Sequence, residues 1–133
     1  MLKLPMKKPA TKMSDGQLKL ERMREIESVE NFDEFLSGEP NDRIIFFYAL
    51  WCRHSMALER KLLGLQKTWG DSIQFGKLDV DQVPFVATQL CVVTTPTVIR
   101  FISGEQVAHS VGNKNSRIIQ SDLKFVRSSP LSR

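Results

Sequence analysis

The chain has 133 residues, the length of one domain, and its 41% hydrophobic and 26% charged residues are proportions typical of a soluble globular protein. No apolar run approaches the ~20 residues that a membrane helix needs. Two cysteines are too few for a small secreted disulfide scaffold, so the sequence predicts an intracellular, reducing compartment.

The net charge of +4 is concentrated at the two ends of the chain. Residues 1–12 contain four lysines and no acid, and residues 114–133 contain five basic residues and one acid. Such ends are either solvated tails or contacts for nucleic acid, acidic proteins or anionic lipid. The first residues lack the apolar core of a secretory signal, and Pro5 and Pro9 fit poorly in a mitochondrial presequence helix. A cytoplasmic location is therefore favoured, with the mitochondrial matrix as the alternative.

In chain order, the pattern predicts a flexible basic arm at 1–14 and a short exposed helix at 15–25. Continuous apolar runs then alternate with segments whose apolar residues recur at helical spacing. The expected strands are 25–29, 43–50, 73–80, 95–103 and 106–112, and the expected helices are 30–38, 54–69, 83–90 and 116–126. Crossovers through the first three strands and a final hairpin predict an α/β fold with a mixed sheet.

A cysteine stands between the central apolar strand and the next helix, in the sequence Trp51-Cys52-Arg53-His54-Ser55. At a helix N-terminus, unpaired backbone N–H groups and the helix dipole favour an anion. The positive charge of Arg53, joined by that of His54 when protonated, would lower the thiol pKa further and stabilise a thiolate that attacks disulfides. Cys52 as an inert thiol is the competing interpretation.

The second cysteine, Cys91, follows Cys52 by 39 residues, which matches no metal-ligand spacing, and His54 and His109 complete no zinc site. We therefore expect no metal and no bound cofactor. Cys91 is expected to lie in the apolar core rather than to pair with Cys52.

From about residue 25 to 127 the chain resembles thioredoxin. "ALWCRHS" stands where that family carries Trp-Cys-Gly-Pro-Cys, "FGKLDVDQVP" resembles its third strand and turn, and "TTPTVIRFISGEQVAHSVG" resembles its Pro-Thr strand and last hairpin. The resemblance implies the thioredoxin fold, a central mixed sheet flanked by helices. It also implies a cis bond before Pro96 and a substrate or partner groove at Trp51, Thr95, Pro96 and Gly112.

The implied division is a basic N-terminal extension at 1–24, a thioredoxin-like domain at 25–127 and a tail at 128–133. Shorter stretches, "REIESVENFDEF" and "VPFVATQLCVVTTPT", also resemble the phosducin-like group of thioredoxin-fold chaperone cofactors.

The sequence departs from the thioredoxin pattern at parts of the reductase cycle. Ser55 replaces the resolving cysteine, and Phe46 replaces the buried Asp that assists proton transfer. Lys77, which resembles the lysine facing that acid, is then expected to turn toward solvent. Arg60 replaces the proline in the middle of the helix. Net disulfide reduction by this chain alone is therefore not expected.

Two functions remain open. The favoured one is a non-reductase protein-interaction or structural module of a larger assembly, with a protein partner at the groove. Its basic N-terminal arm could also contact nucleic acid through Lys3, Lys7, Lys8 and Lys12. The alternative is a monothiol thiol–disulfide exchange protein that uses Cys52, with glutathione or another protein as the resolving thiol.

Overall fold

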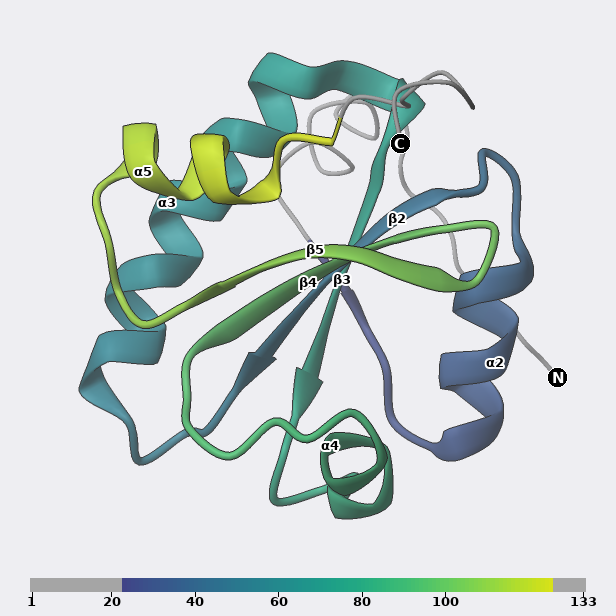
Figure 1. Cartoon of the computed structure of the whole chain (residues 1–133). Coiled ribbons are helices and arrows are strands. Elements are labelled where there is room, and N and C mark those ends of the chain that lie inside the picture. The colour runs from purple at the N-terminus through teal and green to yellow at the C-terminus, as the bar shows by residue number, and fades with distance from the viewer. Residues whose placement is uncertain (1–22, 126–133) are drawn as a thin grey trace, which may run out of the picture.

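The computed structural model describes residues 23–125 (Figure 1). The expected basic arm with its four lysines, most of the expected helix at 15–25 and the tail at 128–133 lie outside these residues. The end of that expected helix is wrong, because Arg24–Glu25 forms the first strand, β1.

Five strands form one mixed sheet in the order β1-β3-β2-β4-β5. β1 and β2 both pair with β3 in parallel, whereas β4 pairs with β2 and with β5 in antiparallel orientation. The remaining strands are β2 (Asp42–Tyr48), β3 (Gln74–Asp79), β4 (Thr97–Ile102) and β5 (Glu105–Val111). The expected α/β fold with a mixed sheet is confirmed.

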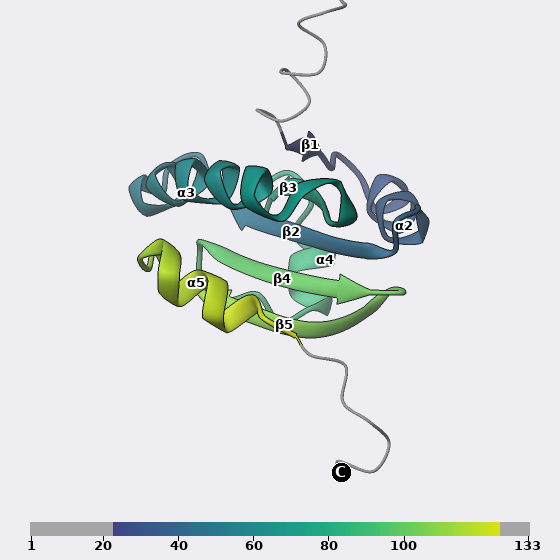
Figure 2. The same ribbon diagram turned by 90° about the horizontal axis from the view of Figure 1, so that it is seen from above.

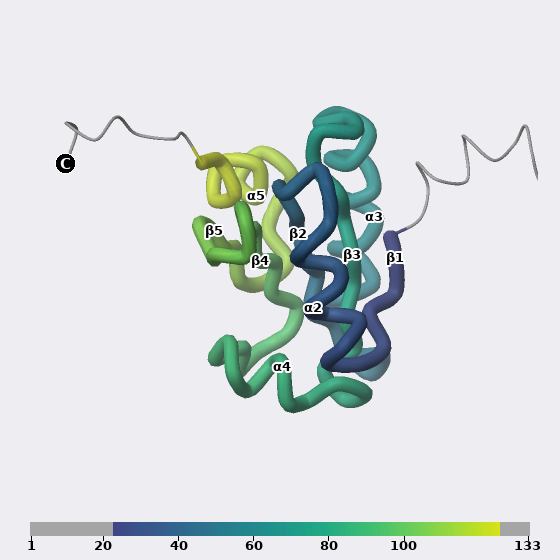
Figure 3. Tube along the Cα trace, turned by 90° about the vertical axis from the view of Figure 1, so that its right-hand side faces the viewer, coloured from purple at the N-terminus to yellow at the C-terminus, as the bar shows by residue number. Residues whose placement is uncertain are grey.

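Within residues 23–125, four α-helices cover the two faces of this sheet, as Figures 1 and 2 show. They are α2 (Val29–Ser37), α3 (Arg53–Trp69), α4 (Pro84–Gln89) and α5 (Ser116–Leu123). α3 and α5 pack on one face and α2 and α4 on the other, which separates the apolar interior into two clusters. Figure 3 shows the strands side by side, from β5 on the left to β1 on the right, with α2 lying over the middle of the sheet.

β2 lies at the centre of the sheet and contributes to both clusters. Phe46 faces α3 and α5, and Phe47 faces α2 and α4; both side chains are fully buried. The continuous apolar run in the sequence reflects this double burial, because a central strand has no solvent-facing side. The same packing fixes the end of β2 and therefore the loop that carries the cysteine.

Local capping explains where two predicted elements begin and end. The expected strand 25–29 is reduced to two residues because Ser28 caps α2, its hydroxyl accepting a hydrogen bond from the Asn31 N–H at 3.0 Å. α3 ends as expected at Gly70, whose φ of 71° suits a glycine. No helix formed by residues 23–125 combines the length and the apolar character that crossing a membrane requires.

Candidate thiol site

Cys52 is the N-cap residue of α3, at the end of the loop that leaves β2. The loop is closed by a hydrogen bond from the Cys52 N–H to the Ala49 carbonyl at 3.0 Å. The Cys52 side chain is only 8% exposed, and its Sγ lies 3.6 Å from the carbonyl oxygen of Thr95. The central strand and the loop before β4 therefore hold the thiol at the protein surface with little freedom.

The surroundings of Cys52 lower its pKa below the ordinary value. The largest cause is a hydrogen bond from the Thr95 side chain, followed by one from Ser55, and burial opposes both. The backbone N–H groups of Ser55 and His54 add to the lowering, as expected at a helix N-terminus. The Thr95 hydroxyl oxygen is buried, and no other hydrogen-bond partner for it lies within residues 23–125.

The stabilising groups differ from those expected from the sequence. Arg53 and His54 have exposed side chains, and the charge of neither is among the causes of the lowered Cys52 pKa. Of the two, His54 contributes through its backbone N–H alone. The sequence pattern identified the activated thiol, whereas Thr95, 43 residues away in sequence, was assigned only to the groove.

Ser55 occupies the position where a resolving thiol would lie. Its side chain is 1% exposed, and its hydroxyl oxygen accepts a long hydrogen bond from the Ala49 N–H at 3.5 Å. A hydroxyl here stabilises the Cys52 thiolate but cannot attack a disulfide, because it supplies no sulfur. The site is built for one thiol.

A groove of about 330 Å³ runs beside Cys52. Its lining residues are Trp51, Val80, Val92, Val93, Thr94 and Thr95. Trp51 is 73% exposed, and its indole N–H donates a hydrogen bond to Asp81 Oδ2 at 2.7 Å. The sequence analysis pointed to Trp51 and Thr95. It did not point to Val93, which lines the groove, or to Asp81, which binds Trp51. These two residues follow α4 and β3, respectively, and belong to no recognisable motif.

The bond between Thr95 and Pro96 is cis, as the resemblance implies. The Pro96 carbonyl accepts a hydrogen bond from the Gly112 N–H at 2.8 Å, and Gly112 has a φ of 93° that favours glycine. Of the four expected groove residues, Trp51 and Thr95 line the groove, whereas Pro96 and Gly112 are not among its lining residues. Met56 is 65% exposed on α3.

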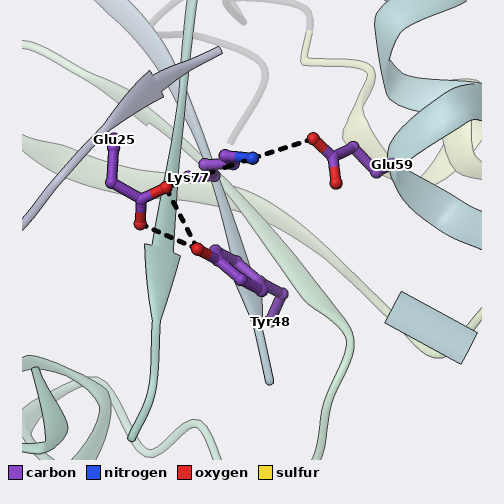
Figure 4. Close-up of polar contacts among 4 residues, drawn as sticks. All are labelled: Glu25, Tyr48, Glu59 and Lys77. Carbon is purple, nitrogen blue, oxygen red and sulfur yellow. Dashed lines mark hydrogen bonds and ion pairs between the residues drawn. The ribbon is translucent and has the colours of Figure 1, made fainter. Parts of the chain in front are cut away.

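A cluster of polar side chains lies behind the site, between β1, β2, β3 and α3 (Figure 4). The Tyr48 hydroxyl lies 3.0 and 2.9 Å from the two carboxylate oxygens of Glu25. The Lys77 ammonium donates to Glu59 Oε2 at 3.0 Å and lies 4.0 Å from Glu25 Oε1. The expectation that Lys77 turns toward solvent is wrong, because Glu59 and Glu25 replace the acid that Phe46 cannot provide.

The cluster also affects the protonation of its acids. Burial is the main cause that raises the pKa of Glu25, against the lowering effects of Tyr48 and Lys77. Burial and the adjacent Glu25 raise the pKa of Tyr48 as well. Tyr48 stacks on Phe46 with ring centroids 5.5 Å apart, so a phenyl ring separates this polar cluster from the apolar interior.

Cys91 is exposed, which corrects the expectation that it lies in the core. It follows α4 with a φ of 59°, and its N–H bonds to the Thr88 carbonyl while that of Val92 bonds to Ala87. This is the Schellman arrangement that ends helices, and its left-handed position is usually filled by glycine. In this motif Val92 packs against the interior, and Cys91 remains outside.

Within residues 23–125, no three His, Cys, Asp or Glu side chains gather as a metal site would require.

The family model for thioredoxin matches residues 24–124. A thioredoxin-like protein of Synechocystis sp. is 32% identical over 97 residues, covering 72% of this chain and 92% of that protein. Bacillus subtilis thioredoxin is 30% identical over 94 residues, covering 69% of this chain and 90% of that protein.

Solved structures show the same fold. Thioredoxin from Trypanosoma brucei brucei matches with a TM-score of 0.69 at 23% identity, covering 83% of this chain and 93% of that one. Mitochondrial thioredoxin 3 from Saccharomyces cerevisiae matches with a TM-score of 0.67 at 22% identity, covering 75% and 92%. With its sheet order, its thiol at the start of α3 and the family match over most of its length, the chain belongs to the thioredoxin family.

Proposed function

We propose that this protein is a monothiol thiol–disulfide exchange protein in which Cys52 is the nucleophile and an external thiol completes the reaction. The observation that carries the proposal is the covered Cys52 thiol, whose pKa is lowered by the hydroxyls of Thr95 and Ser55. This support reverses the preference drawn from the sequence, where the missing second thiol favoured a binding module. The relatives named thioredoxin and thioredoxin-like protein support exchange chemistry as the function of this chain.

In the first step, the Cys52 thiolate attacks one sulfur of a disulfide. A Cys52 mixed disulfide forms, the original S–S bond breaks, and the departing thiolate carries away the electron pair. Ser55 cannot displace the bound half, so a second thiolate, such as that of glutathione, attacks it and releases Cys52. Cys52 is a free thiolate again. The net result is that the second thiol is now joined by a disulfide bond to the half of the substrate that Cys52 had held.

The first test measures the Cys52 pKa from the pH dependence of its alkylation, in a Cys91→Gly background because exposed Cys91 would react too. We expect a pKa below the ordinary ~8.5, and a higher one in the Thr95→Val and Ser55→Ala variants. Glutathione disulfide should convert the protein to a single mixed disulfide, visible as one added glutathionyl group in the intact mass.

The control is the Cys52→Ser variant in the same background, which should gain no mass. A Cys52 pKa at or above the ordinary value, together with no mixed disulfide, would contradict the exchange function.

A second candidate function is a protein-interaction module, which we propose from the apolar side chains around the site. Leu50, Trp51, Met56 and Val93 are 74%, 73%, 65% and 88% exposed. Exposed apolar groups gathered at one place commonly mark a protein contact. A partner or larger assembly, with the basic N-terminal lysines as a further contact, would dock there without using the thiol.

The two functions differ in what Cys52 does for a bound protein. If the module function holds, a protein that co-purifies with the chain from its own cells stays bound to the Cys52→Ser variant. It should then be lost from a Leu50→Ser, Val93→Ser double variant. Loss from the Cys52→Ser variant, with release by a reducing agent, instead identifies a disulfide-trapped substrate.

A further inference from the structure

The charged side chains around Cys52 are arranged so that positive charge at the rim remains uncancelled. The first turn of α3 contains no acid, and the exposed Arg53 side chain has neither an ion pair nor a hydrogen bond within residues 23–125. Because the Arg53 side chain is exposed, its charge is open to solvent and to whatever approaches the thiol.

A second cation lies about two turns after Arg53 on the same helix. Lys61, on α3, donates to the Asn113 amide oxygen at 2.9 Å and to the Lys114 carbonyl at 2.8 Å. Asn113 follows Gly112, which bonds to the Pro96 backbone beside the thiol. Both acceptors are neutral, so the charge of Lys61 is held in place without being neutralised.

The acids near the site are mostly occupied elsewhere. Glu59 is paired with Lys77 at 3.0 Å, and Asp79 is 9% exposed and accepts a hydrogen bond from the Asp81 N–H at 2.9 Å. Asp81 itself binds the Trp51 indole on the groove side. Asp81 is thus the acid at the groove, whereas Arg53 and Lys61, with His54 as a third basic group, lie on α3.

From this arrangement, and building on the proposed exchange function, we infer that Cys52 selects disulfides that carry negative charge beside the attacked sulfur. Glutathione disulfide, with its carboxylates, is the small-molecule form of this substrate class, and acidic segments around a protein disulfide are the macromolecular form. Attraction to Arg53 brings the disulfide to the thiolate, which then breaks the S–S bond and forms the Cys52 mixed disulfide.

The test measures the rate at which reduced protein, in the Cys91→Gly background, forms a mixed disulfide with three probes. These are anionic glutathione disulfide, neutral bis(2-hydroxyethyl) disulfide and cationic cystamine. The Arg53→Glu variant should react about fivefold more slowly with glutathione disulfide at low salt, and faster with cystamine, because the charge at the rim is reversed. Its rate with the neutral disulfide is the reference for the other two, because any change in the thiol pKa affects all three probes alike.

The matched control is Lys67→Glu, the same charge change on the same helix, about 21 Å further along its axis. Its side chain is exposed, and it should leave all three rates unchanged. At about 1 M salt, where the Debye length is about 3 Å, the Arg53→Glu effect should disappear.

Equal changes with all three probes, or the same selectivity change in Lys67→Glu, would overturn the inference while the exchange function stands. A protein that forms a mixed disulfide with none of the probes overturns the exchange function and this inference with it.

Discussion

In the proposed exchange reaction, Ser55 determines the fate of Cys52 after it has formed a mixed disulfide. Its buried hydroxyl lies where a second sulfur would meet the Cys52 sulfur. Serine differs from cysteine only in having oxygen in place of this sulfur. The family resemblance identified this substitution from the sequence. Its energetic role, a hydroxyl that lowers the Cys52 pKa, required the structure.

Replacing Ser55 with cysteine should restore internal resolution. In the Ser55→Cys variant, with Cys91→Gly, the new thiolate attacks the Cys52 mixed disulfide, releases the bound glutathione and forms an internal disulfide with Cys52. After treatment with glutathione disulfide, the intact mass should correspond to the loss of two hydrogens, with no added glutathionyl group. A mixed disulfide that persists in this variant would show that a sulfur at position 55 cannot reach the Cys52 sulfur.

Cys91 is the second residue whose role depends on backbone geometry. Its φ of 59° is one that a glycine adopts without steric cost. We expect Cys91→Gly to raise the free energy of unfolding by about 0.5–1 kcal/mol, because relief of the left-handed strain exceeds the added chain entropy. Urea unfolding measures this, with Cys91→Ala as the control that keeps the strain. A less stable glycine variant would mean that the Cys91 side chain makes a stabilising contact.

At the scale of elements, α2 lies close against β3 at Gly76. A Cβ at this position would lie 2.9 Å from Phe35 Cζ and 3.1 Å from Ile26 Cδ1, both in the buried interior. Gly76 therefore allows α2 to approach the sheet closely. Its conformation is that of an ordinary strand, so the requirement comes from packing.

Gly76→Ala should lower the free energy of unfolding by about 1–3 kcal/mol, because the Phe35 ring must move within a filled interior. The double variant Gly76→Ala, Phe35→Leu should lose less than the sum of the two single changes, since a shorter side chain makes room for the methyl group. Denaturant unfolding of all four proteins gives the coupling. Strict additivity would mean that α2 and the sheet separate without resistance.

The strands and helices could be predicted from the sequence because the spacing of apolar residues that indicates each of them lies within one short segment. The continuous apolar run of β2 and the helical spacing of α3 indicated both elements to within two residues. The interactions that were missed join distant segments. Lys77 was wrongly predicted to face solvent because its partners, Glu25 and Glu59, come from a two-residue strand and from a helix face. Neither carries a signal that links it to β3.

For the molecule as a whole, the response to acid depends on carboxylates that are stabilised only in the folded chain. Asp122, on α5, accepts hydrogen bonds from the Lys114 ammonium and the Ser110 hydroxyl, both at 2.9 Å. The Lys114 bond is the main cause that lowers the pKa of Asp122 below its ordinary 3.8. The resulting stability is complete above that ordinary value and is lost as pH falls through the lower folded pKa.

Asp122→Asn should therefore lower the free energy of unfolding at pH 7 by about 1 kcal/mol. The difference from the parent should shrink as the pH falls below about 4, where the parent carboxylate takes up a proton in the unfolded state first and then in the folded state. Urea unfolding at a series of pH values measures both effects. A difference that is constant down to the acid limit would show that the charge of Asp122 contributes nothing.

The two thiols of this chain combine acidity and accessibility in opposite ways. Cys52, whose pKa is lowered, is 8% exposed, whereas Cys91 stands in solvent after α4. The order in which they are labelled therefore depends on the size of the reagent: a small alkylating agent at mildly acidic pH marks Cys52 first, and a bulky polymer-linked maleimide marks Cys91 first. A thiol titration of the unmodified chain with one reagent would therefore report the reactivity of whichever cysteine that reagent labels first, and not that of both.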